Sequence, residues 1–164
     1  MRWLPYCHAI DDDDLGTRYM SPLSPRLAGV VAALPLRPGM RVIEIGCGPG
    51  AAARAVAERL GPGGHVLAVD RSAKAIAQLT ESSADLIGAG RLSARCSAVE
   101  DLEPDPGEEP FDLAFAIRVG AFDGRFPSAG ERGLQRLARM LVPGAGLYID
   151  GGDPLRRIEL PVAD

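Results

Sequence analysis

The sequence predicts a single α/β domain, with a mostly parallel sheet covered by helices on both faces. Short, continuously apolar runs alternate with helical stretches along the chain, and this order is typical of parallel strands buried on both faces. The length of 164 residues corresponds to one domain that is large enough to bury a core.

Strands are expected at the apolar runs, and a loop is expected where prolines and acidic residues gather, at 103–110. The runs that predict strands, including the weaker third one, are residues 40–45, 65–70, 92–99, 111–119 and 146–150. Residues 156–162 are long enough for one further short strand, but not for a strand–helix–strand unit.

Four helices are expected between the strands. A serine hydroxyl can accept a hydrogen bond from an unpaired first-turn N–H, and proline is favoured in that turn. The first expected helix spans 25–34 and follows Ser24, and the second spans 51–60 and ends at a glycine-rich stretch. The third begins after Ser72 and runs through residue 79. The fourth begins at Ser128, where Glu131 completes a capping box, and runs to about residue 141.

Composition narrows the partners and the compartment. The net charge of −4 argues against nucleic acid, because phosphate contacts need clustered cations. No apolar run approaches the ~18 residues that a membrane span needs. Three distant cysteines, Cys7, Cys47 and Cys96, favour reduced thiols in the cytoplasm. We expect no metal site, because Cys7 and His8 lack a second ligand pair and the aspartates at 11–14 are typical of a solvated loop.

The most informative stretch is the sequence VIEIGCGPG at 42–50, where a strand leads directly into a glycine-rich turn and a helix. Gly46 permits a sharp turn, and Gly48 and Gly50 let the backbone approach a ligand closely. The helix that follows would present unpaired N–H groups to that ligand. A tight turn without a ligand remains the alternative interpretation.

Two acidic residues sharpen this hypothesis. Glu44 lies two residues before Gly46, where a buried carboxylate is costly unless it meets a cation or hydrogen-bond donors. Asp70 ends the second strand, where a carboxylate can accept hydrogen bonds from both ribose hydroxyls. Alternatively, Asp70 is only a helix N-terminal acid stabilised by the helix dipole.

The glycine pattern leaves the nucleoside cofactor open. Gly46, Gly48 and Ala51 satisfy the dinucleotide fingerprint, whereas a phosphate-binding P-loop is excluded because no Gly-Lys-Ser/Thr follows. The acid at Glu44 falls where a dinucleotide site has an apolar residue. Glu44 therefore favours a ligand that bears an ammonium and no pyrophosphate.

The stretch EIGCGPG at 44–50 resembles the first motif of the class I S-adenosylmethionine-dependent methyltransferases. Similar motifs follow in the family's order over residues 24–151: Asp70 at the ribose acid, SAVEDL at 97–102, FDLAF at 111–115 and LVPGAGLY at 141–148. The resemblance implies a Rossmann-like fold with strand order 3-2-1-4-5. It also implies methyl transfer from S-adenosylmethionine, with S-adenosylhomocysteine as the product.

The resemblance also implies roles for individual residues. The methionine part of the cofactor would be held by Glu44 and by the backbone of Gly46, Cys47 and Gly48, within the turn that Gly50 completes. Asp70 would bind the ribose and Arg71 would lie along the adenine. The adenine edge would meet Val99 and Glu100, and the methyl would be bordered by Ile117 and Arg118.

Departures from the family pattern limit the acceptor. Ala98 stands where the family often has an aspartate for the adenine amino group, so either Glu100 or Asp101 substitutes or that contact is absent. No Asn/Asp-Pro-Pro-Tyr follows the fourth strand, so nothing supports methylation of bases or glutamine amides. A general base is optional. The candidates are Tyr6, His8, Tyr19, Asp123 and Asp150, and no pattern singles out one of them, so the catalytic residues stay unknown. Arg118 is either a binder of an anionic acceptor or an ordinary strand-end arginine.

We therefore expect a methyltransferase domain at 24–164 that acts on a small molecule, with residues 1–23 as a candidate lid over the acceptor site. The alternatives are an NAD(P)-dependent oxidoreductase and a non-catalytic S-adenosylmethionine-binding subunit or regulator. Because few residues follow the fifth strand, its edge is expected to be uncovered. An uncovered edge favours a homodimer.

Overall fold

A computed structural model describes residues 23–163 of the chain. Its centre is a six-stranded sheet in the order β3-β2-β1-β4-β5-β6, in which every neighbouring pair except the last is parallel. The order 3-2-1-4-5 expected from the sequence is confirmed. The strands are β1 (Arg41–Ile45), β2 (His65–Asp70), β3 (Leu92–Cys96), β4 (Leu113–Ala116), β5 (Gly146–Asp150) and the antiparallel β6 (Leu155–Glu159).

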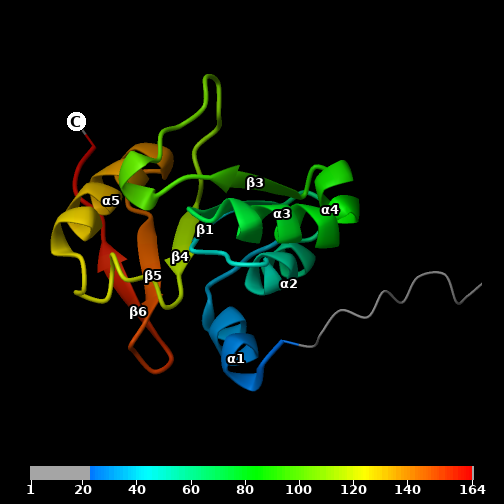
Figure 1. Ribbon diagram of the computed structural model, residues 1–164, viewed down its shortest axis with the longest axis horizontal. Helices are drawn as coiled ribbons and strands as arrows, with labels where there is room; N and C mark the ends of the chain where they lie inside the picture. Colours follow the sequence, from blue (N-terminus) through cyan, green and yellow to red (C-terminus); the bar gives the residue numbers. More distant parts are fainter. Residues whose placement is uncertain (1–22, 164) are drawn as a thin grey trace, which may run out of the picture.

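Helices cover both faces of the sheet (Figure 1). One face carries α1 (Pro25–Ala33), α2 (Ala51–Leu60), α3 (Ala73–Ser82) and the short α4 (Ala84–Gly88). The other carries α5 (Pro127–Met140) and the 3-10 turn η2 (Val99–Asp101). No helix within the described residues is long and apolar enough to cross a membrane.

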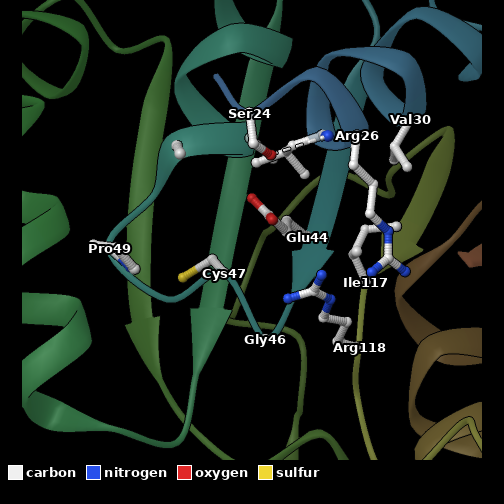
Figure 2. A pocket seen from close by; sticks show the side chains of 12 residues that line it. Ser24, Arg26, Val30, Glu44, Gly46, Cys47, Pro49, Ile117 and Arg118 are labelled. Atoms are coloured by element: carbon white, nitrogen blue, oxygen red, sulfur yellow. Dashed lines mark hydrogen bonds between the residues drawn. The ribbon is translucent and has the colours of Figure 1, made fainter. Parts of the chain in front are cut away.

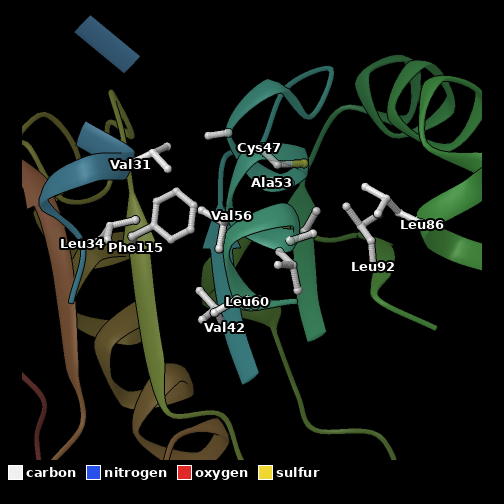
Figure 3. Packing of buried hydrophobic residues seen from close by; sticks show 14 of the residues in the cluster. Val31, Leu34, Val42, Cys47, Ala53, Val56, Leu60, Leu86, Leu92 and Phe115 are labelled. Atoms are coloured by element: carbon white, nitrogen blue, oxygen red, sulfur yellow. The ribbon is translucent and has the colours of Figure 1, made fainter. Parts of the chain in front are cut away.

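The alternation of side chains along the strands explains why both faces are packed. Val42 of β1 points into the layer beneath α1 and α2, and its neighbour Ile43 points into the layer beneath α5; both are fully buried. Figure 3 shows the first layer, where Phe115 of β4 lies among Val31 and Val56. Burial on both faces is the reason why these strands are continuously apolar in sequence.

Several expected boundaries were wrong. The third strand ends at Cys96, and the chain then turns into η2 with Val99 buried in the core. The fourth strand ends at Ala116, because Arg118 has the left-handed backbone conformation (φ 58°) that breaks a strand. The capping box at Ser128 is absent: α5 begins at Pro127 after Phe126, with no side-chain cap. The helix α4 had no clear sequence signal.

The expected uncovered edge at the fifth strand was also wrong. Residues 155–159 form β6, which pairs with β5 along its whole length from Gly146 to Asp150. The expected short strand therefore exists and covers the edge that the dimer prediction used. The outer edge now belongs to β6, and the homodimer stays a prediction.

Candidate functional site

The glycine-rich turn joins β1 to α2 at the carboxyl end of the sheet. Gly46, Gly48 and Gly50 all have positive φ, at 71°, 53° and 88°. A Cβ on Gly46 would lie 2.6 Å from Val119 Cγ2, and one on Gly50 would lie 2.7 Å from the Leu79 side chain. Each conformation favours glycine, and a Cβ at Gly46 or Gly50 would also force the Val119 or Leu79 side chain to move.

Asp70, at the end of β2, holds the turn in place. Its Oδ2 accepts a hydrogen bond from the Gly48 N–H at 2.9 Å, and its Oδ1 accepts one from the Ser72 N–H at 2.8 Å. The N–H groups of Gly46 and Cys47 both donate to the Val69 carbonyl, at 2.8 and 3.1 Å. The carboxylate is thus oriented before any ligand arrives, with lone pairs left to accept further bonds.

Glu44 is the buried acid of the site. The residue is only 4% exposed, and its Oε2 has no hydrogen-bond partner within the described part of the chain. Burial raises its pKa from 4.5 to about 8; the Ala53 N–H and the Arg54 charge oppose the shift, and the charge on Asp70 adds to it. An unpartnered buried carboxyl of this kind is unfavourable unless a ligand completes it.

Two cavities lie along the carboxyl ends of the strands. The first, of about 330 Å³, lies between α1, the glycine turn and the end of β4 (Figure 2). The second, of about 340 Å³, lies between the end of β2, η2 and the segment after β4. Gly46 and Arg118 line both cavities, so the two form neighbouring halves of one cleft.

Most of the site residues predicted from the sequence meet in this cleft. Gly48 and Gly50 line neither cavity and instead shape the turn. The first cavity is lined by Glu44, Gly46, Cys47, Ile117 and Arg118, and the second by Gly46, Asp70, Arg71, Val99, Glu100 and Arg118. Cys47 is buried, and that burial raises the pKa of its thiol, so it presents no thiolate to a ligand.

Sequence reasoning missed the walls of both cavities. Ser24, Arg26, Leu27 and Val30 of the α1 region complete the first, and Phe126 stands at the second with 57% of its surface exposed. An aromatic residue in a chain that is only 5% aromatic was the one local signal. The α1 residues carry no motif, because tertiary packing alone brings them to the site.

Asp150, at the end of β5, serves as a brace. Its Oδ1 accepts the backbone N–H of Arg118 at 3.0 Å, and its Oδ2 accepts the Arg26 guanidinium at 2.9 Å. Both oxygens are therefore engaged, which disfavours Asp150 as a general base. Asp123 is exposed, and its hydrogen bond from Arg125 lowers its pKa, which makes it a weaker base. The other three candidates, Tyr6, His8 and Tyr19, lie outside the described residues, as does the candidate lid.

The family described as "Methyltransferase domain" matches residues 42–144. The chain belongs to this family. It is one of the class I S-adenosylmethionine-dependent methyltransferases, and S-adenosylmethionine is the cofactor of that family. The match contains the glycine turn, Glu44, Asp70 and the ends of β3 and β4.

Individual relatives agree with the family. The chain is 30% identical to a nocamycin O-methyltransferase of Saccharothrix syringae, over 87% of this chain and 47% of that protein. It is 33% identical to a protein-L-isoaspartate O-methyltransferase of Methylorubrum populi, over 80% and 56%. A SAM-dependent methyltransferase structure from Aquifex aeolicus shares the fold, with a TM-score of 0.61, 22% identity and coverage of 75% and 62%. The chain spans about half the length of these two curated relatives.

Proposed function

We propose that this chain binds S-adenosylmethionine in the cleft and transfers its methyl group to a small-molecule acceptor. The observation that carries the proposal is Glu44, a buried carboxyl with an unpartnered oxygen that faces the first cavity beside the glycine turn. An ammonium is the group that such a carboxyl lacks. The α-ammonium of the cofactor's methionine part would supply it.

The rest of the cleft fits the remaining parts of the cofactor. In the second cavity Asp70 stands ready for ribose hydroxyls, and Val99 with η2 borders a space for the adenine. The amino-acid carboxylate suits the start of α2, because Gly50 gives that helix no side-chain cap and Ala51 and Ala52 line the first cavity. A pyrophosphate fits poorly, because it would bring negative charge to Glu44 without the ammonium that accompanies the amino-acid carboxylate.

The protein's main task in the proposed mechanism is to align the methyl donor with the acceptor. The bound cofactor supplies a methyl group that its sulfonium already activates for in-line displacement. Gly46 and Arg118, which line both cavities, border the place where the two halves of the cleft meet. By holding the two reactants in line and excluding water, such a site can contribute roughly 7–11 kcal/mol.

A small molecule is the acceptor that the first cavity favours. The part of this cavity that the methionine end of the cofactor leaves free is bordered by Leu27 and Val30 of α1, and such an apolar wall is typical of small-molecule sites. The names of the two curated relatives mention a small molecule and a protein residue. The cavity gives the reason to prefer the first.

Calorimetric titration and labelled methyl transfer test this proposal. We expect S-adenosylhomocysteine to bind with micromolar affinity, Asp70→Asn to weaken it, and the exposed Asp85→Asn on α4 to leave it unchanged. We also expect labelled methyl groups to reach at least one member of a small-molecule panel. Binding of NAD without S-adenosylhomocysteine would overturn the cofactor assignment. Cofactor binding with no transfer to any acceptor would overturn the catalytic part and favour a non-catalytic subunit.

A further inference from the structure

Arg118 is an exposed arginine at the junction of the two cavities. Its guanidinium has no ion-pair or hydrogen-bond partner within residues 23–163, although it lines both halves of the cleft. Its backbone is the one non-glycine residue in this part of the chain with positive φ, at 58°. Such conformations cost free energy and gather at functional sites.

The end of β5 holds this unfavourable conformation in place. Asp150 accepts the Arg118 N–H through one oxygen and pairs with Arg26 through the other. Figure 2 shows that the Arg26 and Arg118 side chains approach the same side of the cavity, near Ile117, with Glu44 across from them. Since Asp150 already compensates Arg26, the charge available to a ligand on this side is that of Arg118.

Apolar side chains also line the first cavity beside Arg118, between the polar groups of Ser24, Arg26 and Glu44. Leu27 and Val30 of α1 and Ile117 at the end of β4 line the same cavity. A guanidinium next to an apolar wall recognises a carboxylate attached to an apolar body, because the planar fork can donate two parallel hydrogen bonds to the two carboxylate oxygens.

Two carboxylates compete for this guanidinium: that of the cofactor and that of an acceptor. The start of α2 offers the cofactor carboxylate an alternative, because Gly50 provides no side-chain cap and Ala51 and Ala52, whose first-turn N–H groups have no intrahelical partner, line the cavity. That position lies beside Glu44 and the glycine turn, where the neighbouring ammonium is assigned. Arg118 is then left for the second reactant.

We propose that Arg118 determines specificity by binding the carboxylate of the methyl acceptor, which is a small apolar carboxylic acid. This inference rests on the proposed function, because it assigns Glu44 and the start of α2 in the first cavity, and the whole second cavity, to S-adenosylmethionine. It adds a substrate class that the family match does not give.

Benzoate and its neutral isostere benzamide are the probes for the test. Binding to the protein saturated with S-adenosylhomocysteine is followed by NMR titration. We expect benzoate to bind at least tenfold more tightly than benzamide, and Arg118→Gln to remove about tenfold of benzoate affinity, as is typical for a hydrogen bond to a charged group. The exposed Arg132→Gln on α5 is the matched control and should change nothing. Failure of benzoate to bind, equal binding of benzamide, or equal binding to Arg118→Gln would overturn the inference.

A second comparison separates the two carboxylates. S-Adenosylhomocysteine carries the amino-acid carboxylate, whereas 5′-methylthioadenosine lacks it. If Arg118→Gln lowers the affinity for S-adenosylhomocysteine tenfold and leaves that for 5′-methylthioadenosine unchanged, Arg118 binds the cofactor carboxylate and the inference is wrong. We expect both affinities to change less than twofold. Arg118→Gly removes the side chain, and glycine adopts positive φ without strain. This variant should therefore fold and show the same two affinities as Arg118→Gln.

The two proposals fail in different ways. Loss of S-adenosylhomocysteine binding in the wild-type protein would overturn the proposed function. Retained S-adenosylhomocysteine binding with no benzoate binding would overturn only the role of Arg118.

Discussion

Replacing Glu44 with glutamine should make the cofactor-free protein more stable at alkaline pH. It should also lower the affinity for S-adenosylhomocysteine. Glutamine keeps the shape of the side chain and removes its ionisation. In the folded protein the pKa of Glu44 is raised from 4.5 to about 8 by burial. The folded state therefore prefers the protonated carboxyl, and this preference stabilises the fold fully only below pH 4.5.

The size of the effect follows from the pKa difference. At about 1.36 kcal/mol per unit, the shift of roughly 3.5 units means that Glu44 destabilises the wild-type fold by up to about 5 kcal/mol as the pH rises from 4.5 to 8. Glu44→Gln has no such loss. The unfolding free energy of wild type minus that of the variant should fall through this window and level off above pH 8.

Urea denaturation of the cofactor-free proteins at half-unit steps from pH 4.5 to 9 measures this difference. Glu81→Gln, an exposed glutamate on α3, is the matched control and should run parallel to the wild type. Parallel curves for Glu44→Gln and wild type across the whole window would refute the reasoning. In the same variant, S-adenosylhomocysteine affinity should fall by about tenfold or more, because the ammonium loses a charged partner.

Four other predictions follow from single contacts. Gly46→Ala should abolish S-adenosylhomocysteine binding and lower the melting temperature, because its Cβ would collide with Val119 at positive φ. The control Gly29→Ala, in open space on α1, should stabilise the fold by about 0.5–1 kcal/mol. Calorimetry that finds the same binding and melting temperature for both variants contradicts this. Phe126→Ala should weaken S-adenosylhomocysteine by a few-fold, since the aromatic surface at the second cavity is worth roughly 0.5–1.5 kcal/mol, and unchanged affinity would remove Phe126 from the site. A double-mutant cycle of Arg26→Gln and Asp150→Asn should give a coupling free energy of about 0.2–1 kcal/mol in urea denaturation, because the pair is partly exposed. A coupling of zero would show that the pair between Arg26 and Asp150 does not stabilise the fold. Light scattering should find the homodimer predicted from the sequence, and a monomer at micromolar concentration would end that prediction.

The sequence predicted the fold well because its strands are buried on both faces. The apolar runs located β1, β2 and β5 within one residue, and the turn after β1 was clear from three glycines whose positive φ no other residue favours. The end of β3 was overestimated because Val99 stays apolar after its strand has ended, and that of β4 because the sequence did not indicate the positive φ of Arg118. Apolar residues predict burial, and burial continues beyond the ladder of hydrogen bonds.

Only some residues of the candidate site could be predicted from the sequence. Glu44 and Asp70 stood out because acids are rare at the ends of buried strands. Arg26 did not, and Asp150 was predicted only as a candidate general base, because their meeting across 124 residues depends on how α1 packs against the sheet. The backbone conformation of Arg118 was equally hidden, since it is held by a hydrogen bond that the Arg118 N–H donates to Asp150 of β5.

A crystal structure of the protein soaked with S-adenosylhomocysteine tests the central claim most directly. The account predicts electron density for the ribose hydroxyls at the Asp70 carboxylate, the adenine beside Val99, and the α-ammonium within hydrogen-bond distance of Glu44 Oε2. Density for the ligand outside this cleft, or an ammonium turned away from Glu44, would contradict the account.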